Sequence, residues 1–306
     1  MKIGIIAVTY NSQKDIARLL ESIVIQRYEN LLIYVVDNNS KDETLNIIQK
    51  FNSKISISVI SSLENNGYAK GNNIGIQKAM NEGCELVFIL NPDMQLEEKC
   101  IDILTKRIMS DVKIGVIGPI ALLGTKPGDI IQGYGVTANF RTQKKTILFG
   151  DKKLSNDLPQ EIFVDFVHGG AMMIRSSVLK INGLFEEKYF MYNDELDISY
   201  RIKKAGYKIL CMRDAIVRHY HDFSKQNRTG NNIMYYYMMR NRYLYFRKYH
   251  LYNNLVLSLI VEVISFPVKI IWALRRLKNI NILQFYYSGL LDGLLGKNGI
   301  ANKSFD

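Results

Sequence analysis

The first 118 residues alternate between short apolar segments of strand length and longer segments with the apolar period of a helix. Strands are predicted at 3–8, 31–36, 55–60, 86–90 and 114–117, and helices after Ser12 and at 44–51, 69–80 and 96–108. Repeated β-α units of this length predict a mostly parallel, twisted sheet with helices on both faces. The fold class is therefore α/β.

The rest of the chain departs from this rhythm. Glycine and proline recur over residues 119–164, which predicts hairpins or ordered loops. Strands return, a helix is predicted from Asp197 to Ala205 with Gly206 as its cap, and short strands follow at 208–212 and 215–219. We expect one large domain over residues 1–225, with halves 1–118 and 119–225, and a helical region over residues 226–306.

The three cysteines, Cys84, Cys100 and Cys211, show no C-x-x-C spacing, so neither a disulfide framework nor a thiolate zinc site is expected. Residues 1–8 form too short an apolar run for a signal peptide and are predicted to be the first strand. Both features fit a reducing, cytoplasmic location.

The formal net charge of +11 indicates an anionic partner: nucleic acid, an acidic membrane surface or a phosphorylated substrate. Basic residues flank a long apolar stretch, a pattern typical of a membrane surface. The tyrosines between them could instead stack on nucleobases, but we favour the membrane and expect no nucleic acid. The basic residues are Arg240, Arg242, Arg247, Lys248, Lys269, Arg275, Arg276 and Lys278, and the tyrosines are Tyr235, Tyr236, Tyr237, Tyr243 and Tyr245.

The apolar stretch at 251–274 carries a stripe of polar residues at helical spacing, and Pro267 is expected to kink it. The stripe consists of Asn254, Ser258, Glu262, Ser265 and Lys269. We expect first an interfacial helix, second a helix packed on the main domain with a solvated edge, and third a membrane span. The span comes last because two central charges are costly in hydrocarbon.

Two acidic segments follow predicted strands or buried turns. Asn91-Pro92-Asp93 follows a continuous apolar strand, so it lies at the edge of the sheet where α/β folds bind ligands. It could be only a turn, but its position favours Mn²⁺ or Mg²⁺ bridging a diphosphate. In Asp194-Glu195-Leu196-Asp197, the helix dipole accounts for Asp197, whereas Asp194 and Glu195 follow an aromatic wall and are candidates for a general base.

Three further features are weaker. Asp37 follows a strand and could accept hydrogen bonds from a nucleoside, while Asn38–Asp42 reads as an Asx turn. Glycines spaced four apart in Asn65–Gly75 allow close approach to a ligand or, alternatively, tight helix packing. His219 ends a short strand and could be structural or a metal ligand.

The order and spacing of these segments resemble the inverting glycosyltransferases of family 2, with the nucleotide-diphospho-sugar transferase (GT-A) fold, and especially a rhamnosyltransferase-like branch. The resemblance covers residues 3 to about 221. Its matching strings are Ala7–Asn11, Val35–Asp42, Asn66–Gly75, Ile89–Met94, His168–Arg175, Gly183–Glu187, Phe190–Asp197 and Arg201–Gly206.

The resemblance implies a role for each matching site residue. Asp93 would bind the metal with His219 as a further contact, and Glu195, or Asp194 next to it, would be the catalytic base. The usual Asp-x-Asp appears here as Asn-Pro-Asp, which makes Asn91 a weaker ligand. The implied donor-binding residues are Thr9, Tyr10, Asp37, Asn66, Gly67, Asn72, Asn91, Gly169 and Gly170.

The implied reaction is a single displacement in which the base takes a proton from an acceptor hydroxyl and the configuration at the anomeric carbon inverts. The donor would be a nucleotide sugar, with dTDP-rhamnose suggested by the branch, and the acceptor a saccharide or lipid-linked glycan of cell-surface polysaccharide synthesis. We expect a peripheral protein on the inner face of the cell membrane, and an oligomer is compatible with this expectation. Alternatives are a catalytically silent scaffold subunit of a polysaccharide assembly complex and a nucleotidyltransferase, although the latter's phosphate loop is absent.

Overall fold

The computed structural model describes residues 1–306 except 126, 221–227, 278–279 and 306. It comprises two compact units. The first contains residues 1–138, 145–185 and 195–221, and the second contains 139–144, 186–194 and 222–306. The domain boundary expected at residue 225 lies outside the described residues. Two short segments, 139–144 and 186–194, group with the C-terminal helices.

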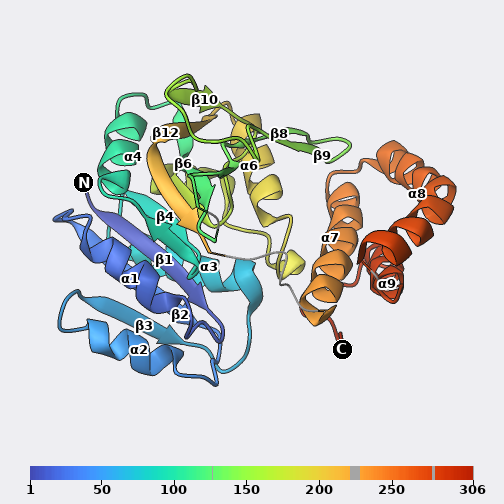
Figure 1. Cartoon of the computed structure of the whole chain (residues 1–306), viewed down its shortest axis with the longest axis horizontal. Helices are drawn as coiled ribbons and strands as arrows, with labels where there is room; N and C mark the ends of the chain where they lie inside the picture. The colour runs from blue at the N-terminus through green and yellow to red at the C-terminus, as the bar shows by residue number, and fades with distance from the viewer. Residues whose placement is uncertain (126, 221–227, 278–279, 306) are drawn as a thin grey trace. The chain divides into compact units, whose positions relative to one another are not determined.

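The first unit is built on a mixed sheet with the strand order β10-β12-β6-β11-β4-β1-β2-β3 (Figure 1). Six of these eight strands, β12, β6, β4, β1, β2 and β3, run in one direction, whereas β11 is antiparallel to both its neighbours and β10 to β12. The mostly parallel sheet is therefore confirmed. The bounds are β1 Ile3–Thr9, β2 Leu31–Asp37, β3 Ile57–Ser61, β4 Leu86–Leu90, β6 Ile114–Leu123, β10 Glu161–Phe163, β11 Ala171–Arg175 and β12 Lys208–His219.

Alternate residues of the central strands point to opposite faces, and each face is covered by helices. Ile5 and Ile33 belong to a core shared with α1, α2 and α4, whereas Ile6 and Tyr34 belong to a core shared with α3, α5 and α6. Helices on both faces were predicted. The helices are α1 Ile16–Val24, α2 Thr44–Phe51, α3 Gly67–Asn81, α4 Cys100–Met109, α5 Ser176–Asn182 and α6 Asp194–Lys204.

Several predicted elements differ in detail. The helix predicted from Asp197 begins at Asp194 as α6. α1 begins at Ile16, because the Ser12 side chain accepts a hydrogen bond from the Tyr10 backbone N–H instead of capping the helix. The helix predicted from residue 96 begins at Cys100 and is preceded by a short strand, β5, Met94–Leu96. The two strands predicted at 208–212 and 215–219 form one strand, β12, with a register irregularity between Met212 and Ile216.

Short strands fill the segment 119–164, as the glycines and prolines predicted. β7 (Ile131–Gly133) pairs with β6, and β8 (Val136–Asn139) pairs with β9 (Lys144–Ile147). The pairing of β7 with β6 brings Gln132 into the first unit's sheet, where its side chain becomes part of the site described below.

Two glycines of the Asn65–Gly75 segment serve helix packing. A Cβ at Gly71 would lie 2.7 Å from Val8 Cγ1, and one at Gly75 would lie 2.5 Å from Ile6 Cγ2, both on β1. α3 therefore approaches the sheet more closely than a larger residue would allow. For Gly71 and Gly75, the structure favours the packing alternative over ligand approach.

The second unit contains three longer helices, α7 (Arg228–Lys248), α8 (Tyr252–Trp272) and α9 (Ile282–Leu294), with a π-helical turn at Ala273–Leu277 (Figure 1). α7 and α9 pack closely. A Cβ at Gly289 would lie 2.2 Å from the Tyr236 carbonyl oxygen, and one at Gly293 would lie 2.5 Å from that of Arg240. Glycine at these positions is what permits the contact.

Most of the basic and aromatic residues of α7 are buried, so their interpretation as a membrane-surface or base-stacking pattern is wrong for the buried tyrosines and for Arg240. Tyr236, Tyr237, Tyr243 and Tyr245 are buried in the second unit, and so is Arg240. The rings of Tyr236 and Tyr237 pack against each other and against the guanidinium of Arg240. Arg247 and Lys248 remain exposed.

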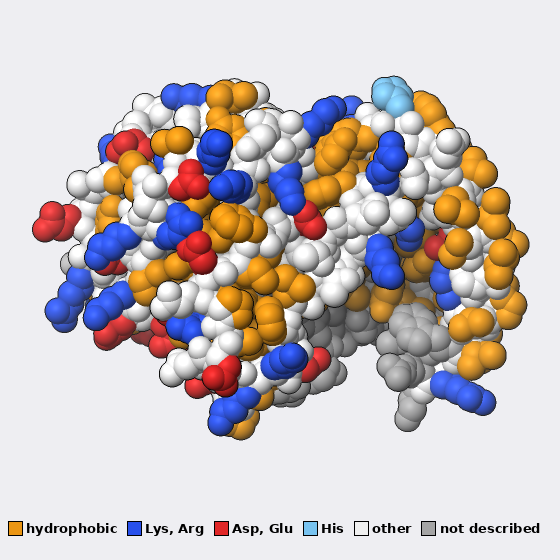
Figure 2. All heavy atoms as spheres, turned by 90° about the horizontal axis from the view of Figure 1, so that it is seen from above, with side chains coloured by type: hydrophobic (Ala, Val, Ile, Leu, Met, Phe, Trp, Pro, Cys, Tyr) orange, Lys and Arg blue, Asp and Glu red, His pale blue; other side chains and the backbone are white. Residues whose placement is uncertain are grey.

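α8 differs from an ordinary surface helix because its polar face is buried and its apolar face is exposed. Its polar stripe faces inward: Glu262 is buried, pairs with Lys269, and accepts a hydrogen bond from the Tyr286 hydroxyl at 3.0 Å. Its apolar side chains face outward, with Val263 75% and Ile264 72% exposed. Figure 2 shows hydrophobic side chains gathered along this outer side of the C-terminal helices. The expectation of a solvated polar edge is therefore wrong.

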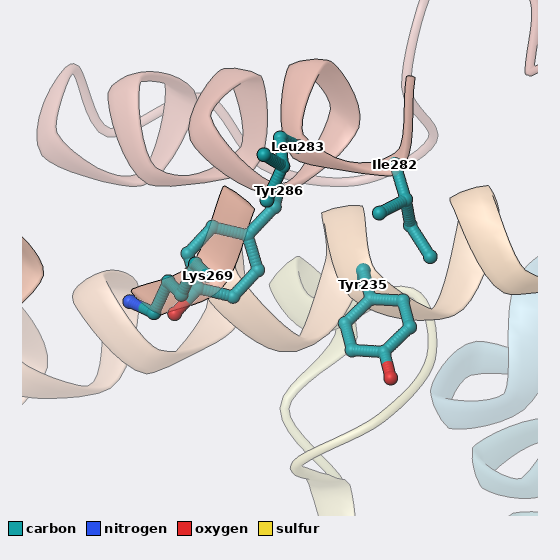
Figure 3. Close-up of a pocket in the computed structure, with 5 residues that line it drawn as sticks. All are labelled: Tyr235, Lys269, Ile282, Leu283 and Tyr286. Carbon is teal, nitrogen blue, oxygen red and sulfur yellow. The ribbon is translucent and has the colours of Figure 1, made fainter. Parts of the chain in front are cut away.

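Among the described residues, one helix, Tyr252–Arg275, is long and apolar enough to cross a membrane, and 12% of its most apolar window is buried. Behind it, a cavity of about 200 Å³ is lined by Tyr235, Lys269, Ile282, Leu283 and Tyr286. Figure 3 shows Tyr286 beside Lys269 and Tyr235 below Ile282. The charges that seemed costly for a membrane helix are thus paired on the protein side of α8.

Candidate active site

Strand pairing brings Asp93 and His219 together, although they are 126 positions apart. β5 is antiparallel to the end of β12, with Met94 opposite His219, and the Tyr220 N–H donates to the Asp93 carbonyl oxygen at 2.9 Å. Asp93 Oδ2 then lies 3.1 Å from His219 Nε2. Asn91-Pro92-Asp93 therefore forms the turn between β4 and β5, and this turn directs the Asp93 carboxylate toward His219.

The surroundings of His219 fit a divalent cation. Its Nδ1 lies 2.9 Å from Gln132 Oε1, and when that oxygen accepts the Nδ1 proton, the Nε2 lone pair is directed at the Asp93 carboxylate. A cation between these two electron-rich groups would stabilise them. The described residues contain no group of three or more His, Cys, Asp or Glu side chains arranged for a metal. Such a cation would therefore need substrate oxygens or water as further ligands, as Mg²⁺ commonly does.

His168 is the neighbour of this pair. Its ring packs edge-on against His219, with centroids 5.0 Å apart, and its Nδ1 accepts the Gly170 N–H at 3.1 Å. Burial and, to a lesser extent, the neighbouring His219 lower the pKa of His168 to about 3, although Asp93 opposes the shift. His168 is thus neutral at physiological pH with its proton on Nε2.

Gly169 links the histidines to the proposed base. A Cβ at Gly169 would lie 3.6 Å from Glu195 Cβ and 3.7 Å from Glu195 Oε2, at ordinary van der Waals distance, so the space beside the Gly169 Cα faces the Glu195 side chain. The Tyr68 hydroxyl donates to the Gly169 carbonyl oxygen at 2.7 Å and fixes this loop. Asp93, His219 and His168 therefore contact one another in turn, and Gly169, the residue after His168, faces Glu195 in the first unit.

Gly170 is enclosed on the other side. The Asn91 N–H donates to its carbonyl oxygen at 2.9 Å, and a Cβ there would lie 2.6 Å from Met94 Cε and 2.9 Å from Asn91 Nδ2. The antiparallel pairing of β11 with β4 produces this arrangement, because Ala171 lies opposite Leu90. Asn91 and Gly170 are therefore beside each other at the carboxyl end of β4.

The three acids at the start of α6 differ in their surroundings. Glu195 is partly exposed, Asp194 is 1% exposed, and Asp197 is buried. Asp197 accepts a hydrogen bond from Arg201 Nε at 3.0 Å, and Arg201 also donates to the backbone carbonyls of Gly183 and Leu184. Asp197 is thus structural, as expected, through this ion pair.

Thr9 and Asp37 are adjacent at the carboxyl ends of β1 and β2, but both are buried. Asp37 Oδ1 accepts from the Thr9 hydroxyl at 2.8 Å and from the Ser40 hydroxyl at 2.6 Å. These bonds tie the two strands and the following turn together. The predicted contact of Thr9 and Asp37 with the nucleoside stays a prediction, whereas Tyr10, 52% exposed, presents an open ring at this edge.

The remaining donor-binding predictions lie at the start of α3. Gly67 has a positive φ of 72°, and its carbonyl oxygen accepts from Asn38 Nδ2 at 3.0 Å. Asn72 is buried and donates to the Tyr68 carbonyl oxygen at 2.9 Å, while its Oδ1 has no hydrogen-bond partner. Asn66 is the N-cap residue of α3 without a side-chain cap bond. These contacts give Asn38 and Asn72 defined positions beside the expected pocket.

Sequence reasoning missed three residues of this site. His168 and Tyr68 lay within segments that had been singled out, but no role was given to their side chains. Gln132 could not have been found, because β7 lies in a segment whose pairing the sequence does not specify. The available signal for His168 was its position directly before the Gly169-Gly170 pair.

A mostly parallel sheet with acids and a histidine at its carboxyl edge is the arrangement expected of a GT-A nucleotide-sugar transferase. Residues 4–181 match the family described as "Glycosyl transferase family 2", and the chain belongs to this family. The chain is therefore a family 2 glycosyltransferase, as the resemblance implied.

Relatives and solved structures agree with this assignment. The chain is 30% identical to the low-salt glycan biosynthesis hexosyltransferase Agl10 of Haloferax volcanii, over 79% of this chain and 74% of that protein. It is 25% identical to the N-acetylglucosaminyl-diphospho-decaprenol L-rhamnosyltransferase of Mycobacterium tuberculosis, over 74% and 78%. The structure of the mannosyltransferase PcManGT from Pyrobaculum calidifontis, in complex with GDP-Man and Mn²⁺, has a TM-score of 0.60 at 13% identity and covers 97% of this chain and 88% of that chain.

Proposed function

We propose that the protein transfers a sugar, with inversion, from a nucleotide-diphosphate donor to a saccharide or lipid-linked acceptor during cell-surface polysaccharide synthesis. The observation that carries this proposal is that Asp93, His219 and His168 contact one another in turn, and that Gly169, next to His168 in the chain, faces Glu195. This arrangement supports a metal-binding role for Asp93 and a base role for Glu195 at the same edge of the sheet. The similarity to an L-rhamnosyltransferase supports dTDP-rhamnose as the donor to test first.

Glu195 is the better candidate for the base. A base must reach the acceptor hydroxyl, and Glu195 is partly exposed beside Gly169, whereas Asp194 is buried. Glu195 would take the acceptor proton while the oxygen attacks the anomeric carbon from the face opposite the diphosphate. Gly169 leaves open the space next to the Glu195 carboxylate.

Asp93 and His219 are the residues that would hold Mn²⁺ or Mg²⁺, and Asn91 lies next to them. The bound ion would supply charge stabilisation for the departing diphosphate. Gln132 holds His219 from its other ring nitrogen and so orients Nε2 toward Asp93. His168, neutral and fixed by the Gly170 N–H, packs against the same ring without adding charge.

We further propose that the second unit docks on the inner face of the cell membrane through the outer side of α8. This side is apolar and exposed, while the Glu262–Lys269 pair neutralises its two charges on the inner side. A helix that buries one face in its own unit and offers the other to lipid fits an interfacial position. A lipid-linked acceptor would be presented at the same surface.

The test is a transfer assay with dTDP-rhamnose, UDP-GlcNAc and GDP-mannose, each with Mn²⁺, comparing wild type with Glu195→Gln and Asp194→Asn. We expect Glu195→Gln to lower kcat by at least 10²-fold, a typical contribution of general-base catalysis. Glu98→Gln, at an exposed carboxylate of the first unit, is the matched control and should retain wild-type kcat.

The same assay separates the alternatives. Loss of activity in Asp194→Asn with retention in Glu195→Gln would move the base to Asp194. Donor hydrolysis without acceptor excludes a silent scaffold subunit, whereas donor binding without any turnover in the wild type would favour one. NMR of the product shows whether the anomeric configuration has inverted.

A further inference from the structure

The segment that leads directly into the proposed base has an unusual backbone. Phe190, Tyr192 and Asn193 all have positive φ values, of 65°, 64° and 72°. Such conformations cost about 1 kcal/mol or more for residues with a side chain, and Phe and Tyr rarely adopt them. They persist only where surrounding contacts hold them. Asp194 and Glu195 follow Asn193 without interruption.

Three of those contacts come from one residue of α7, Asn241. Its fully buried side-chain amide lies 3.0 Å from the Tyr189 carbonyl oxygen, 2.7 Å from that of Met191 and 2.9 Å from that of Tyr192. Two amide protons serve these three acceptors, so at least one bond is shared. One side chain thus satisfies the backbone on both sides of Phe190.

Arg240 orients this amide. Its Nε donates to Asn241 Oδ1 at 3.1 Å, which directs Asn241 Nδ2 toward the segment. Its other nitrogens donate to the carbonyl oxygens of Tyr189 at 2.8 Å and Gly299 at 2.6 Å. Arg240 is 1% exposed, and burying a charge is costly unless it contributes bonds that nothing else supplies.

The segment is anchored at two further points within the same unit. The Phe190 ring stacks on the Tyr237 ring with centroids 5.2 Å apart. The Arg240 guanidinium also lies over the Tyr237 ring, 4.6 Å from its centroid. Asn193 Nδ2 donates to Gln143 Oε1 at 3.3 Å, and Gln143 in turn donates to the Arg242 carbonyl oxygen. These contacts therefore hold the backbone as far as Asn193, the residue before Asp194.

We propose that Arg240 and Asn241 are positioning residues for the transfer reaction: they hold the strained segment 188–193 so that Glu195 enters α6 with its carboxylate beside Gly169. This inference rests on the proposed function, because it takes Glu195 as the base. Without the amide of Asn241, Phe190 and Tyr192 would relax toward negative φ, and the direction in which the chain enters α6 would change. A misplacement of about 1 Å costs on the order of 10²-fold in rate.

The structure offers a matched control on the same helix. Asn232 is also fully buried on α7 and donates its amide to a backbone carbonyl, that of Phe305 at 3.0 Å. Asn232→Ala and Asn241→Ala both remove a buried amide from α7. Only Asn241→Ala releases carbonyl groups next to the base.

The first measurement needs no substrate. Hydrogen–deuterium exchange of full-length Asn241→Ala should be at least tenfold faster than wild type over residues 189–195, whereas Asn232→Ala should leave this segment unchanged. Equal exchange of the segment in both variants would overturn the proposal. Arg240→Lys keeps the charge but removes the guanidinium fork, and it replaces Asn241→Ala if that variant does not fold.

The second measurement separates positioning from folding. With dTDP-rhamnose, or whichever donor of the panel the wild type turns over, Asn241→Ala should lower kcat 10- to 100-fold while KM for the donor changes less than threefold. A merely structural role would instead lower the melting temperature and leave the kcat of the folded protein at the level of Asn232→Ala, which would overturn the inference. If Glu195→Gln retains wild-type kcat, the proposed function fails instead, so the two failures are distinguishable.

Discussion

Asp93 Oδ2 faces His219 Nε2 across 3.1 Å, although each residue belongs to a different strand end. This pair predicts a metal-dependent affinity for the diphosphate. Asp93→Asn and His219→Gln should each weaken the binding of dTDP or UDP at least tenfold in calorimetry with Mn²⁺, because each removes one of the two residues that we propose hold the ion. In EDTA, both variants and the wild type should bind equally weakly.

Asp102→Asn is the control for this experiment, because Asp102 is a partly exposed carboxylate paired with Lys106 on α4. It should bind the nucleoside diphosphate as the wild type does. Wild-type affinity of Asp93→Asn in Mn²⁺ would remove Asp93 from the metal site, and wild-type affinity of His219→Gln would leave His219 with a structural role.

The two adjacent glycines of the site should respond differently to alanine. Gly170→Ala brings a Cβ within 2.6 Å of Met94 and 2.9 Å of Asn91, so it should lower the free energy of unfolding by about 1–3 kcal/mol. Gly169→Ala meets only Glu195 at 3.6 Å and should fold normally, but it should lower the transfer rate at least tenfold by filling space beside the carboxylate. Circular dichroism melts and initial rates check the pair. Equal melting temperatures of the two variants would mean that Gly170 is not confined.

The order of elements in the first unit could be predicted from the sequence because its strands are continuous apolar runs and its helices have clear periodicity. Asp93 could be predicted as a site residue because it follows such a strand, β4. The contacts of His168 and Gln132 could not be predicted, because they depend on non-local pairing: β11 enters between β4 and β6, and β7 pairs with β6. Periodicity carries no information on such pairing.

The second unit was harder to predict for a different physical reason. An amphipathic helix pattern shows two faces but does not say which one is buried, and the usual assumption places the polar face outside. In α8 the polar face is inside, since Glu262, Lys269 and Tyr286 satisfy one another there. The tyrosines of α7 were wrongly predicted to lie on the surface for a related reason. Aromatic side chains among basic ones are equally compatible with a core and with a surface.

Acid should destabilise the second unit through Asp292. Burial alone would raise the pKa of Asp292, but hydrogen bonds from Lys303, Lys297 and Tyr236 lower it to about 2. An unfolded aspartate titrates near about 3.9, so the unfolded state binds the proton first as the pH falls. The stabilisation is therefore fully present above about pH 5 and is lost as the pH falls toward about 2, by about 2 kcal/mol in all.

Urea unfolding of the wild type and Asp292→Asn at pH 6 and pH 3 tests this sign. Asp292→Asn should be less stable at pH 6, and the difference between the two proteins should shrink at pH 3. Using the difference cancels the other carboxylates with lowered pKa values, such as Asp111 and Glu161. A difference that is constant with pH would mean that Asp292 does not titrate as inferred.

The outward face of α8 leads to the prediction of membrane binding. Burying an exposed Val or Ile side chain in lipid contributes about 1.5–3 kcal/mol, so the double variant Val263→Asp, Ile264→Asp should lower the affinity for vesicles by more than about 100-fold. Leu63→Asp is the matched control, because Leu63 is 98% exposed in the first unit and should not contact lipid. Co-sedimentation with phosphatidylglycerol–phosphatidylcholine vesicles is the measurement. Binding through the apolar face should persist at 0.5 M salt, where attraction between the exposed basic side chains and anionic lipid is screened over about 4 Å. Loss of wild-type binding at that salt would show that charge, and not α8, holds the protein on the membrane.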